Sequence, residues 1–466
     1  MRRLLGGAIL TIAIVLGLLL GVGPLALGYL AKAGYEDLLA DLVEDMPNRE
    51  ILQNRYNRGW FASSAAFEVL IPPDPAAQAP LHPIRIRLDS RIEQGPWIWL
   101  TTGFPPILGR VHTRLETDGL PVALPTLPVS IDLHADGSGR MQLRVPPGET
   151  LPTAQAMGLR HGPLDGDLVV SSGQESVEVR LTLPEAALTT PTGPLVRLTD
   201  LQFEADRPDD SSGTGRLQAA LVELYGAAGE VGAGRTVSHV LRIEGLSATL
   251  SRALREGLLD LRLGLSAQQL ATASMSYGRS ELGLSGERLD AEALADLAEG
   301  IRMLATDQVA QEMRGLVTAG LIAGLAPRFV ESATRIGVEP IRIETPDGLA
   351  LGRLDLRLDP GTDSPNALTS GVVDWVILLR ADGDLELPES VALDWIARSL
   401  EPGFEDESLP TSEPAAEQAA RQEAEALLAG WIRDGWITRR ANRVSSALRL
   451  GDGLLTINGK TVPLRR

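Results

Sequence analysis

The sequence predicts an α+β fold that is mostly antiparallel β, in which a single N-terminal transmembrane helix is followed by a long curved β-sheet domain with a few packed helices. Three observations predict it. An uncharged apolar stretch begins at residue 4, short alternating stretches of apolar and polar residues recur after it, and 31 prolines and 48 glycines cluster between those stretches. Alternation with period two is typical of strands that bury one face, and proline and glycine are typical of the turns between them.

The composition excludes several classes of function. The chain has 466 residues and a formal net charge of −18, which opposes binding to a nucleic acid. It has no cysteine, so disulfides, thiolate nucleophiles and cysteine zinc sites are excluded. We expect no cofactor and no nucleic-acid partner.

The N-terminal stretch predicts a membrane anchor at residues 4–30, preceded by a cytoplasmic tip at residues 1–3. A helix of about 27 apolar residues is long enough to cross a hydrocarbon layer of roughly 30 Å. Arg2 and Arg3 favour a cytoplasmic N-terminus. Residues 31–33 (Ala-Lys-Ala) resemble a signal-peptidase site, so a cleaved signal peptide is the alternative, although its apolar region is normally only about 7–15 residues.

Residues 31–55 predict an amphipathic helix that reaches Pro47, a residue that ends helices. One face is apolar and the other acidic. The apolar face comprises Tyr35, Leu38, Leu39, Leu42, Val43 and Met46. Because anionic lipid repels an acidic face, we expect this helix to pack on the β-sheet domain.

An aromatic cluster follows the helix, in a chain with only 4% aromatic residues. Tyr56, Trp60 and Phe61 surround Gly59, which permits a tight bend. We consider two interpretations: a surface that binds a partner through these three aromatic residues, or aromatic anchors at the start of the first strand.

Alternating strands dominate residues 56–288, the predicted N-terminal β-rich region, and residues 331–466, the predicted C-terminal β-rich region. The alternating segments are 84–88, 141–145, 177–183, 241–243, 261–265, 341–343 and 354–358. No short repeat of solenoid length is present, so many similar strands in succession indicate one long curved sheet.

A long helical segment is predicted at residues 289–330, with Asp290 as its N-cap. Its four glycines, at 300, 315, 320 and 324, predict either a break or close packing. A later helix is predicted from about residue 413 to 433, ended by Gly435.

Two hairpin turns are predicted in the C-terminal region. Asp382-Gly383 follows an apolar stretch at residues 372–379, and Asn458-Gly459 joins two short strands at the end of the chain. Both dipeptides are typical of two-residue hairpin turns.

Three short motifs resemble those of the YdgA-like family of bacterial envelope proteins, a family of unknown function. Tyr56, Arg58, Gly59, Trp60, Phe61 and Ser64 are similar to its Y-x-R-G-W-F/L-x-S signature. Residues 92–96 are similar to its I-x-H-G-P segment, with Gln94 in place of histidine, and residues 455–460 are similar to its closing segment. The resemblance implies a bacterial inner-membrane anchor with a periplasmic domain. Together with the cytoplasmic N-terminus that Arg2 and Arg3 favour, it predicts a single-pass inner-membrane protein whose main domain is periplasmic. It implies no reaction and no catalytic residues.

No motif in the sequence supports catalysis. Asp132, His134 and Asp136 share one face of a predicted strand, but the five histidines are otherwise scattered and indicate no metal site. Gly459-Lys460-Thr461 imitates the end of a phosphate-binding loop, but residue 454, where that motif requires glycine, is Leu454. We therefore predict no catalytic and no metal-binding residues.

The sequence thus favours a non-enzymatic protein that binds a hydrophobic ligand such as lipid in a β-sheet groove. Leu261, Leu263 and Leu265, on one face of one strand, are the candidate ligand-binding residues. The alternative is a scaffold or interaction protein of the cell envelope, in which Tyr56, Trp60 and Phe61 contact the partner. A hydrolase of envelope polymers is a third, weaker hypothesis.

Overall fold

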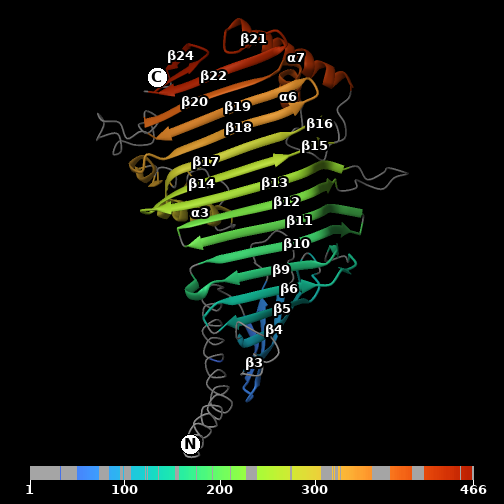
Figure 1. Cartoon of the computed structure of the whole chain (residues 1–466). Helices are drawn as coiled ribbons and strands as arrows, with labels where there is room; N and C mark the ends of the chain where they lie inside the picture. The colour runs from blue at the N-terminus through green and yellow to red at the C-terminus, as the bar shows by residue number, and fades with distance from the viewer. Residues whose placement is uncertain are drawn as a thin grey trace, which may run out of the picture. The chain divides into compact units, whose positions relative to one another are not determined.

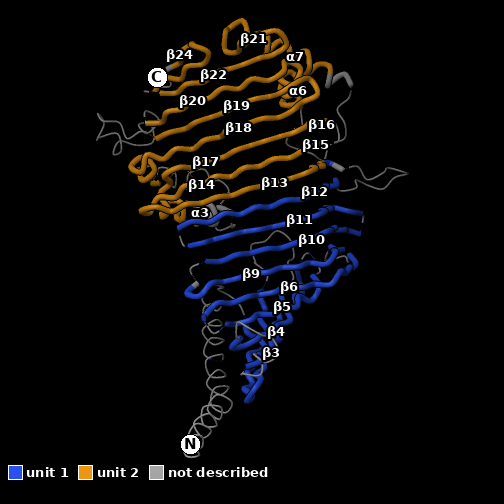
Figure 2. Tube along the Cα trace, viewed as in Figure 1, with its two compact units in different colours: residues 1–240 blue, residues 241–466 orange. Residues whose placement is uncertain are grey.

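The structure is a computed structural model, and the part of the chain that it describes is mostly antiparallel β-sheet (Figure 1). The described residues are 32, 50–72, 83–94, 98, 107–120, 122, 124–134, 136–152, 157–174, 176–191, 193–209, 211–226, 239–272, 275–305, 317–318, 320, 324–325, 327–358, 378–400, 414–451 and 453–463. The chain forms two compact units, Met1–Val240 and Leu241–Arg466 (Figure 2). This boundary falls inside the predicted 56–288 region.

Unit 1 is an antiparallel sheet in which most neighbouring strands are consecutive in the chain. Its elements are β1 (Glu50–Asn57), β2 (Ala62–Ile71), β3 (Ile84–Gln94), β4 (Ile107–Asp118), β5 (Leu127–His134), β6 (Gly139–Val145), β7 (Gly148–Glu149), β8 (Gly158–His161), β9 (Leu164–Val170), η1 (Ser172–Gln174), β10 (Val177–Thr190), β11 (Gly193–Asp209) and β12 (Ser212–Tyr225). The order is β1-β2-β3-β4-β5-β6-β9-β10-β11-β12, and β8 pairs with β10 beyond the end of β9.

The two faces of the unit 1 sheet differ in polarity. In an antiparallel sheet, residues directly opposite one another lie on the same face. Leu181 is opposite Phe203, and Leu143 is opposite Val129, so apolar residues gather on one face. Phe67 and Val69 of β2 are buried on this face, with Ile86 and Leu88 of β3 packed against them.

Unit 2 repeats this design and adds helices. Its elements are β13 (His239–Arg255), β14 (Leu258–Ala267), β15 (Gln269–Thr272), β16 (Ser276–Tyr277), β17 (Ser280–Asp290), α3 (Ala291–Ala305), β18 (Arg335–Thr345), β19 (Gly348–Leu358), β20 (Leu379–Pro388), α6 (Glu389–Leu400), α7 (Pro414–Arg433), β21 (Thr438–Arg440), β22 (Arg443–Gly451), β23 (Leu454–Ile457) and β24 (Lys460–Pro463). The antiparallel order is β13-β14-β17-β18-β19-β20-β22-β23-β24.

Helices α6 and α7 cover one end of the unit 2 sheet. Val391 and Ala392 of α6 and Leu428 of α7 form a buried cluster with the sheet residues Ala350, Leu387 and Val444. The helix α7 ends as predicted, because Gly435 has φ of 66° and the Trp436 amide donates a hydrogen bond back to the Trp431 carbonyl at 2.9 Å.

The structure confirms the strand predictions and the terminal hairpin. All seven alternating segments lie within strands, namely β3, β6, β10, β13, β14, β18 and β19. Strands β23 and β24 pair across Asn458-Gly459, whose φ angles of 48° and 84° fit a type I′ turn.

Two local predictions differ from the structure. Asp382-Gly383 does not form a turn but lies inside β20, where the absence of a side chain at Gly383 leaves room for Leu354 on the neighbouring strand. Residues 50–55, assigned to the amphipathic helix 31–55, belong to β1 and pair with β2, because the chain beyond Pro47 is free to extend. Within the predicted helical segment 289–330, the described helix α3 ends at Ala305.

The predicted transmembrane helix at residues 4–30 lies outside the described residues. In the described part of the chain, no helix combines the length and the apolar character needed to cross a membrane. The longest described helix, α7, includes Arg421, Glu423 and Glu425, whereas a membrane-spanning helix needs about 20 predominantly apolar residues. No described helix is therefore the predicted single N-terminal transmembrane helix, and the inner-membrane, single-pass localisation that depends on it finds no support in the described part of the chain.

Candidate ligand-binding face

Apolar residues cross the unit 2 sheet in rows that run from strand to strand on one face. Leu250 of β13 lies opposite Leu263 of β14, which lies opposite Leu284 of β17. The row continues through Val338 of β18 and Leu354 of β19. Because opposite residues share a face, this row is a continuous apolar band across the strands.

Parallel rows lie two residues to either side of this band. We call the three rows together the apolar stripe. Its members are Leu250, Leu261, Leu263, Leu265, Leu282, Leu284, Ile336, Val338, Ile341, Leu354, Leu356, Leu385, Leu448 and Leu450. All are aliphatic, so the stripe presents no hydrogen-bond donor or acceptor of its own.

Four of the fourteen members of the apolar stripe are exposed to solvent, and the other ten are half-buried. Leu250 is 48% exposed, Leu284 37%, Ile336 45% and Leu385 40%. On the same face of β20, Leu387 is only 5% exposed, because it lies in the cluster beneath α6 and α7. The helices therefore cover one end of the face and leave the stripe beside it uncovered.

Glycines within the rows shape this surface. A Cβ at Gly352 would lie 3.2 Å from Leu385 Cδ1 and 3.3 Å from Ile341 Cδ1, and a Cβ at Gly383 would lie 3.1 Å from Leu354 Cδ1. Leucine and isoleucine side chains thus lean over the neighbouring glycines. The result is a shallow surface made of aliphatic side chains. Such a surface suits contact with an extended hydrocarbon and not acid–base chemistry.

The three leucines selected from the sequence belong to this stripe. Leu261, Leu263 and Leu265 lie on one face of β14, each half-buried. Sequence reasoning missed the exposed members on other strands, such as Leu284 and Leu385. Their alternating positions are visible in the sequence, but the pairing that unites them in one row is not.

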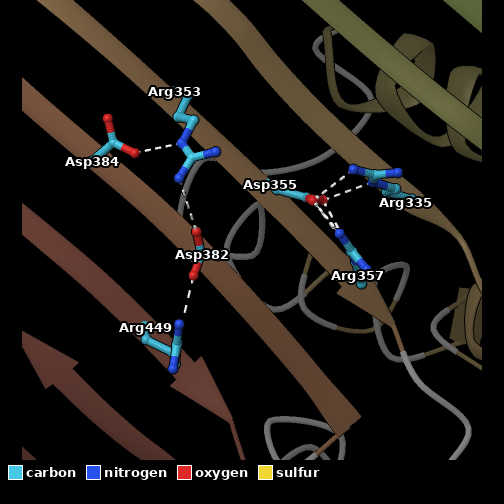
Figure 3. A network of polar contacts seen from close by, with 7 residues as sticks. All are labelled: Arg335, Arg353, Asp355, Arg357, Asp382, Asp384 and Arg449. Carbon is cyan, nitrogen blue, oxygen red and sulfur yellow. Dashed lines mark hydrogen bonds and ion pairs between the residues drawn. The ribbon is translucent and has the colours of Figure 1, made fainter.

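The opposite face of the unit 2 sheet carries a network of ion pairs (Figure 3). Asp355 accepts hydrogen bonds from Arg335 Nη2 at 2.7 Å and from Arg357 Nη2 at 2.6 Å. These hydrogen bonds, from Arg357 and then Arg335, lower the pKa of Asp355 to about 2, so its carboxylate stays ionised.

Two further aspartates extend the network. Arg353 donates to Asp384, and Asp382 lies between Arg353, at 3.7 Å, and Arg449, at 3.5 Å. One face of the sheet is thus apolar and the other is ionic.

The aromatic cluster lies in unit 1. Tyr56 is half-buried in β1, whereas Trp60 and Phe61 precede β2 and are 50% and 48% exposed. The two exposed rings meet edge to face, with centroids 6.4 Å apart. The buried Gln94 amide donates a hydrogen bond to the Gly59 carbonyl at 3.2 Å and so supports the loop that presents them.

Two of the three residues considered as a metal set, Asp132 and Asp136, have separate partners, whereas Nδ1 of His134 is buried without a hydrogen-bond partner among the residues that the structure describes. Asp132 accepts two hydrogen bonds from Arg110, at 2.5 and 2.9 Å. Asp136 accepts hydrogen bonds from the Ser138 amide and hydroxyl in the following turn. The described residues therefore do not bring Asp132 and Asp136 together around a shared ligand position.

The fold and the face define a class: a β-sheet protein whose unit 2 sheet has one partly uncovered aliphatic face and one ionic face. The chain belongs to a bacterial protein family of unknown function (DUF945), whose model matches residues 1–465. No curated protein and no solved structure shows a significant match.

Proposed function

We propose that this protein is a non-enzymatic binding protein and that its apolar stripe holds a hydrophobic ligand, most simply the acyl chain of a lipid. The observation that carries the proposal is the exposure of Leu250, Leu284, Ile336 and Leu385 on one continuous face. Exposed apolar patches of this kind mark binding surfaces in soluble domains.

The dimensions of the stripe suit an acyl chain. The middle row runs from β13 to β22 across seven strands, and strands lie about 4.8 Å apart, so the row is roughly 29 Å long. One leaflet of a bilayer is about 15 Å thick in its hydrocarbon region, so a single extended chain fits along the row. Each methylene that the stripe removes from water contributes about 0.8 kcal/mol.

The chemistry of the stripe favours lipid over protein as the occupant. Protein interfaces are enriched in aromatic residues and arginine, and the stripe contains neither. The inner strands β14, β17, β18, β19 and β20 are paired on both sides, so a peptide cannot add to them as a further strand.

Native mass spectrometry of the full chain tests the proposal. The variants Leu284→Asp and Leu385→Asp place a charge on the stripe at exposed positions, where we expect folding to persist. Leu351→Asp is the matched control, because Leu351 is 38% exposed on the ionic face and does not line the cavity on that face. A copurifying lipid mass should disappear in the two stripe variants and remain in the control. A lipid mass that persists in all three would contradict binding at the stripe.

A second candidate function is contact with another protein through Trp60 and Phe61. The observation that favours it is their exposure in a loop braced by Gln94. It also agrees with the finer resemblance to YdgA-like envelope proteins, whose signature includes both residues. A photo-crosslinking residue at position 60 should then give a discrete protein adduct that is absent when the crosslinker replaces Leu151, which is 75% exposed elsewhere in unit 1. Equal labelling from the two positions would count against a specific partner.

A further inference from the structure

A cavity of about 620 Å³ lies on the ionic face of unit 2, on the side of the sheet opposite the apolar stripe. Its charged lining comprises five arginines but only three acids. These residues are Arg335, Arg353, Arg357, Arg380 and Arg449, with Glu339, Asp355 and Asp382. Within the lining, five positive charges face three negative ones, and Asp384 and Glu287, which pair with Arg353 and Arg335 from beside the cavity, bring the whole cluster to formal neutrality.

Three of these arginines retain unused hydrogen-bond donors. A guanidinium has five N–H donors. Arg357 donates from Nε and Nη2 to Asp355. Arg353 directs Nε to Asp384 and Nη2 to Asp382. Arg449 directs Nε to Asp382. Within the described part of the chain, Nη1 of Arg353, Nη1 of Arg357 and both Nη atoms of Arg449 meet no acceptor.

The aspartates hold these guanidinium groups in place. Asp382 lies 3.7 Å from Arg353 Nη2 and 3.5 Å from Arg449 Nε, so it braces both of them. Asp355 braces Arg357 in the same way at 2.6 Å. Side chains that are already ordered lose less conformational entropy when a ligand binds. The carboxylates weaken the attraction for an anion, but they leave the outward Nη donors unsatisfied.

We propose that this cavity binds an oxyanion of the phosphate class, with Arg353, Arg357 and Arg449 as donors. Guanidinium groups match the geometry of phosphate oxygens, and such charge-assisted hydrogen bonds are among the stronger ones. The three donor side chains leave the sheet on the face opposite the apolar stripe, although Leu354 and Leu450 of the stripe also border the cavity.

Isothermal titration calorimetry of the full chain with inorganic phosphate tests the proposal. The variants Arg353→Gln and Arg449→Gln each remove donors from the cavity, and their side chains are 54% and 78% exposed, so folding should persist. Arg262→Gln is the matched control, because Arg262 is 71% exposed on the same face and does not line the cavity. Thermal melting confirms that each variant is folded.

We expect saturable binding to the native chain, an affinity about tenfold or more lower in each cavity variant, and an unchanged affinity in the control. Absence of saturable binding would overturn the proposal, as would an equal loss in Arg262→Gln, which would indicate diffuse attraction to the whole face.

A second arm identifies the source of the phosphate group. Vesicles containing phosphatidic acid are compared with vesicles of phosphatidylcholine alone. Selective binding to the acidic vesicles that is lost in Arg449→Gln supports a lipid headgroup. Binding of free phosphate without vesicle binding supports a soluble phosphate compound. Failure of both arms refutes the site and leaves the proposal for the apolar stripe untouched.

Discussion

Two leucines on the same face of β20 provide a direct test of whether the apolar stripe is uncovered. Leu387 is 5% exposed and belongs to the cluster beneath α6 and α7, whereas Leu385, two residues earlier, is 40% exposed. Replacement by alanine removes the same atoms at both positions. The two variants therefore differ only in what surrounds the side chain.

The structure sets the expected magnitudes. Leu387→Ala leaves a cavity among Val391, Leu428 and Val444, and buried leucine-to-alanine changes lower the free energy of unfolding by about 2–5 kcal/mol. Leu385→Ala removes the contact with which the side chain covers Gly352, at a position 40% exposed, where no closed cavity forms. We expect it to lower the free energy of unfolding by about 1 kcal/mol.

Urea denaturation of lipid-free protein measures the difference, followed by tryptophan fluorescence, to which all seven tryptophans contribute, and by circular dichroism for the sheet. Losses that agree within about 0.5 kcal/mol at the two positions would show that Leu385 is covered as well as Leu387 is. That result would remove the basis for a ligand-binding stripe. Addition of a bound lipid should raise the stability of the native chain more than that of Leu385→Ala.

Three further predictions concern charge and backbone. The folded-state pKa of Asp355 lies at about 2, below the usual value of about 3.9, so its ion pairs stabilise the fold above about pH 4 and are lost as the pH falls toward 2. Partial exposure limits the effect to about 1–2 kcal/mol, and Asp355→Asn should flatten acid denaturation curves in that window. Gly59→Ala should disrupt the aromatic loop, because the added Cβ would lie 2.1 Å from the Ala62 carbonyl oxygen, and a shift in tryptophan emission should report it. Gly459→Ala should lower the melting temperature, with a loss of about 1 kcal/mol at φ of 84°, whereas Gly451→Ala, in open space at ordinary φ, should not.

Strand locations were predictable because one-sided burial imposes period two on the sequence. Residues 177–183 and 354–358 alternate strictly, and both lie in strands with one apolar and one charged face. The Asn458-Gly459 hairpin was equally predictable, because two successive positive φ angles exclude most other residues. These features depend on local geometry alone.

Features that depend on distant contacts were not predictable. Asp382-Gly383 has the composition of a hairpin turn, but Gly383 lies inside β20, where its lack of a side chain leaves room for Leu354 on β19. Helix α6 was not predicted from the sequence. Its stability derives from the packing of Val391 and Ala392 on the sheet and on α7, and these contacts are distant in the chain. The stripe requires β17 to pair with β18 across the intervening α3, which no pattern in either strand reveals.

The two-faced sheet of unit 2 explains why its uncovered face points to a ligand. In a β-sandwich, a second sheet would cover the apolar residues. Among the described residues, α6 and α7 cover the face around Leu387, and the ion pairs of Asp355 and Asp382 make the other face unsuitable for burial. The edge strand β24 is only four residues long and ends at Pro463, which lacks an amide hydrogen, and both features disfavour further pairing at this edge. A sheet with a protected edge and an unprotected apolar face gains stability from any hydrocarbon that covers that face, and this gain is the driving force that we assign to lipid binding.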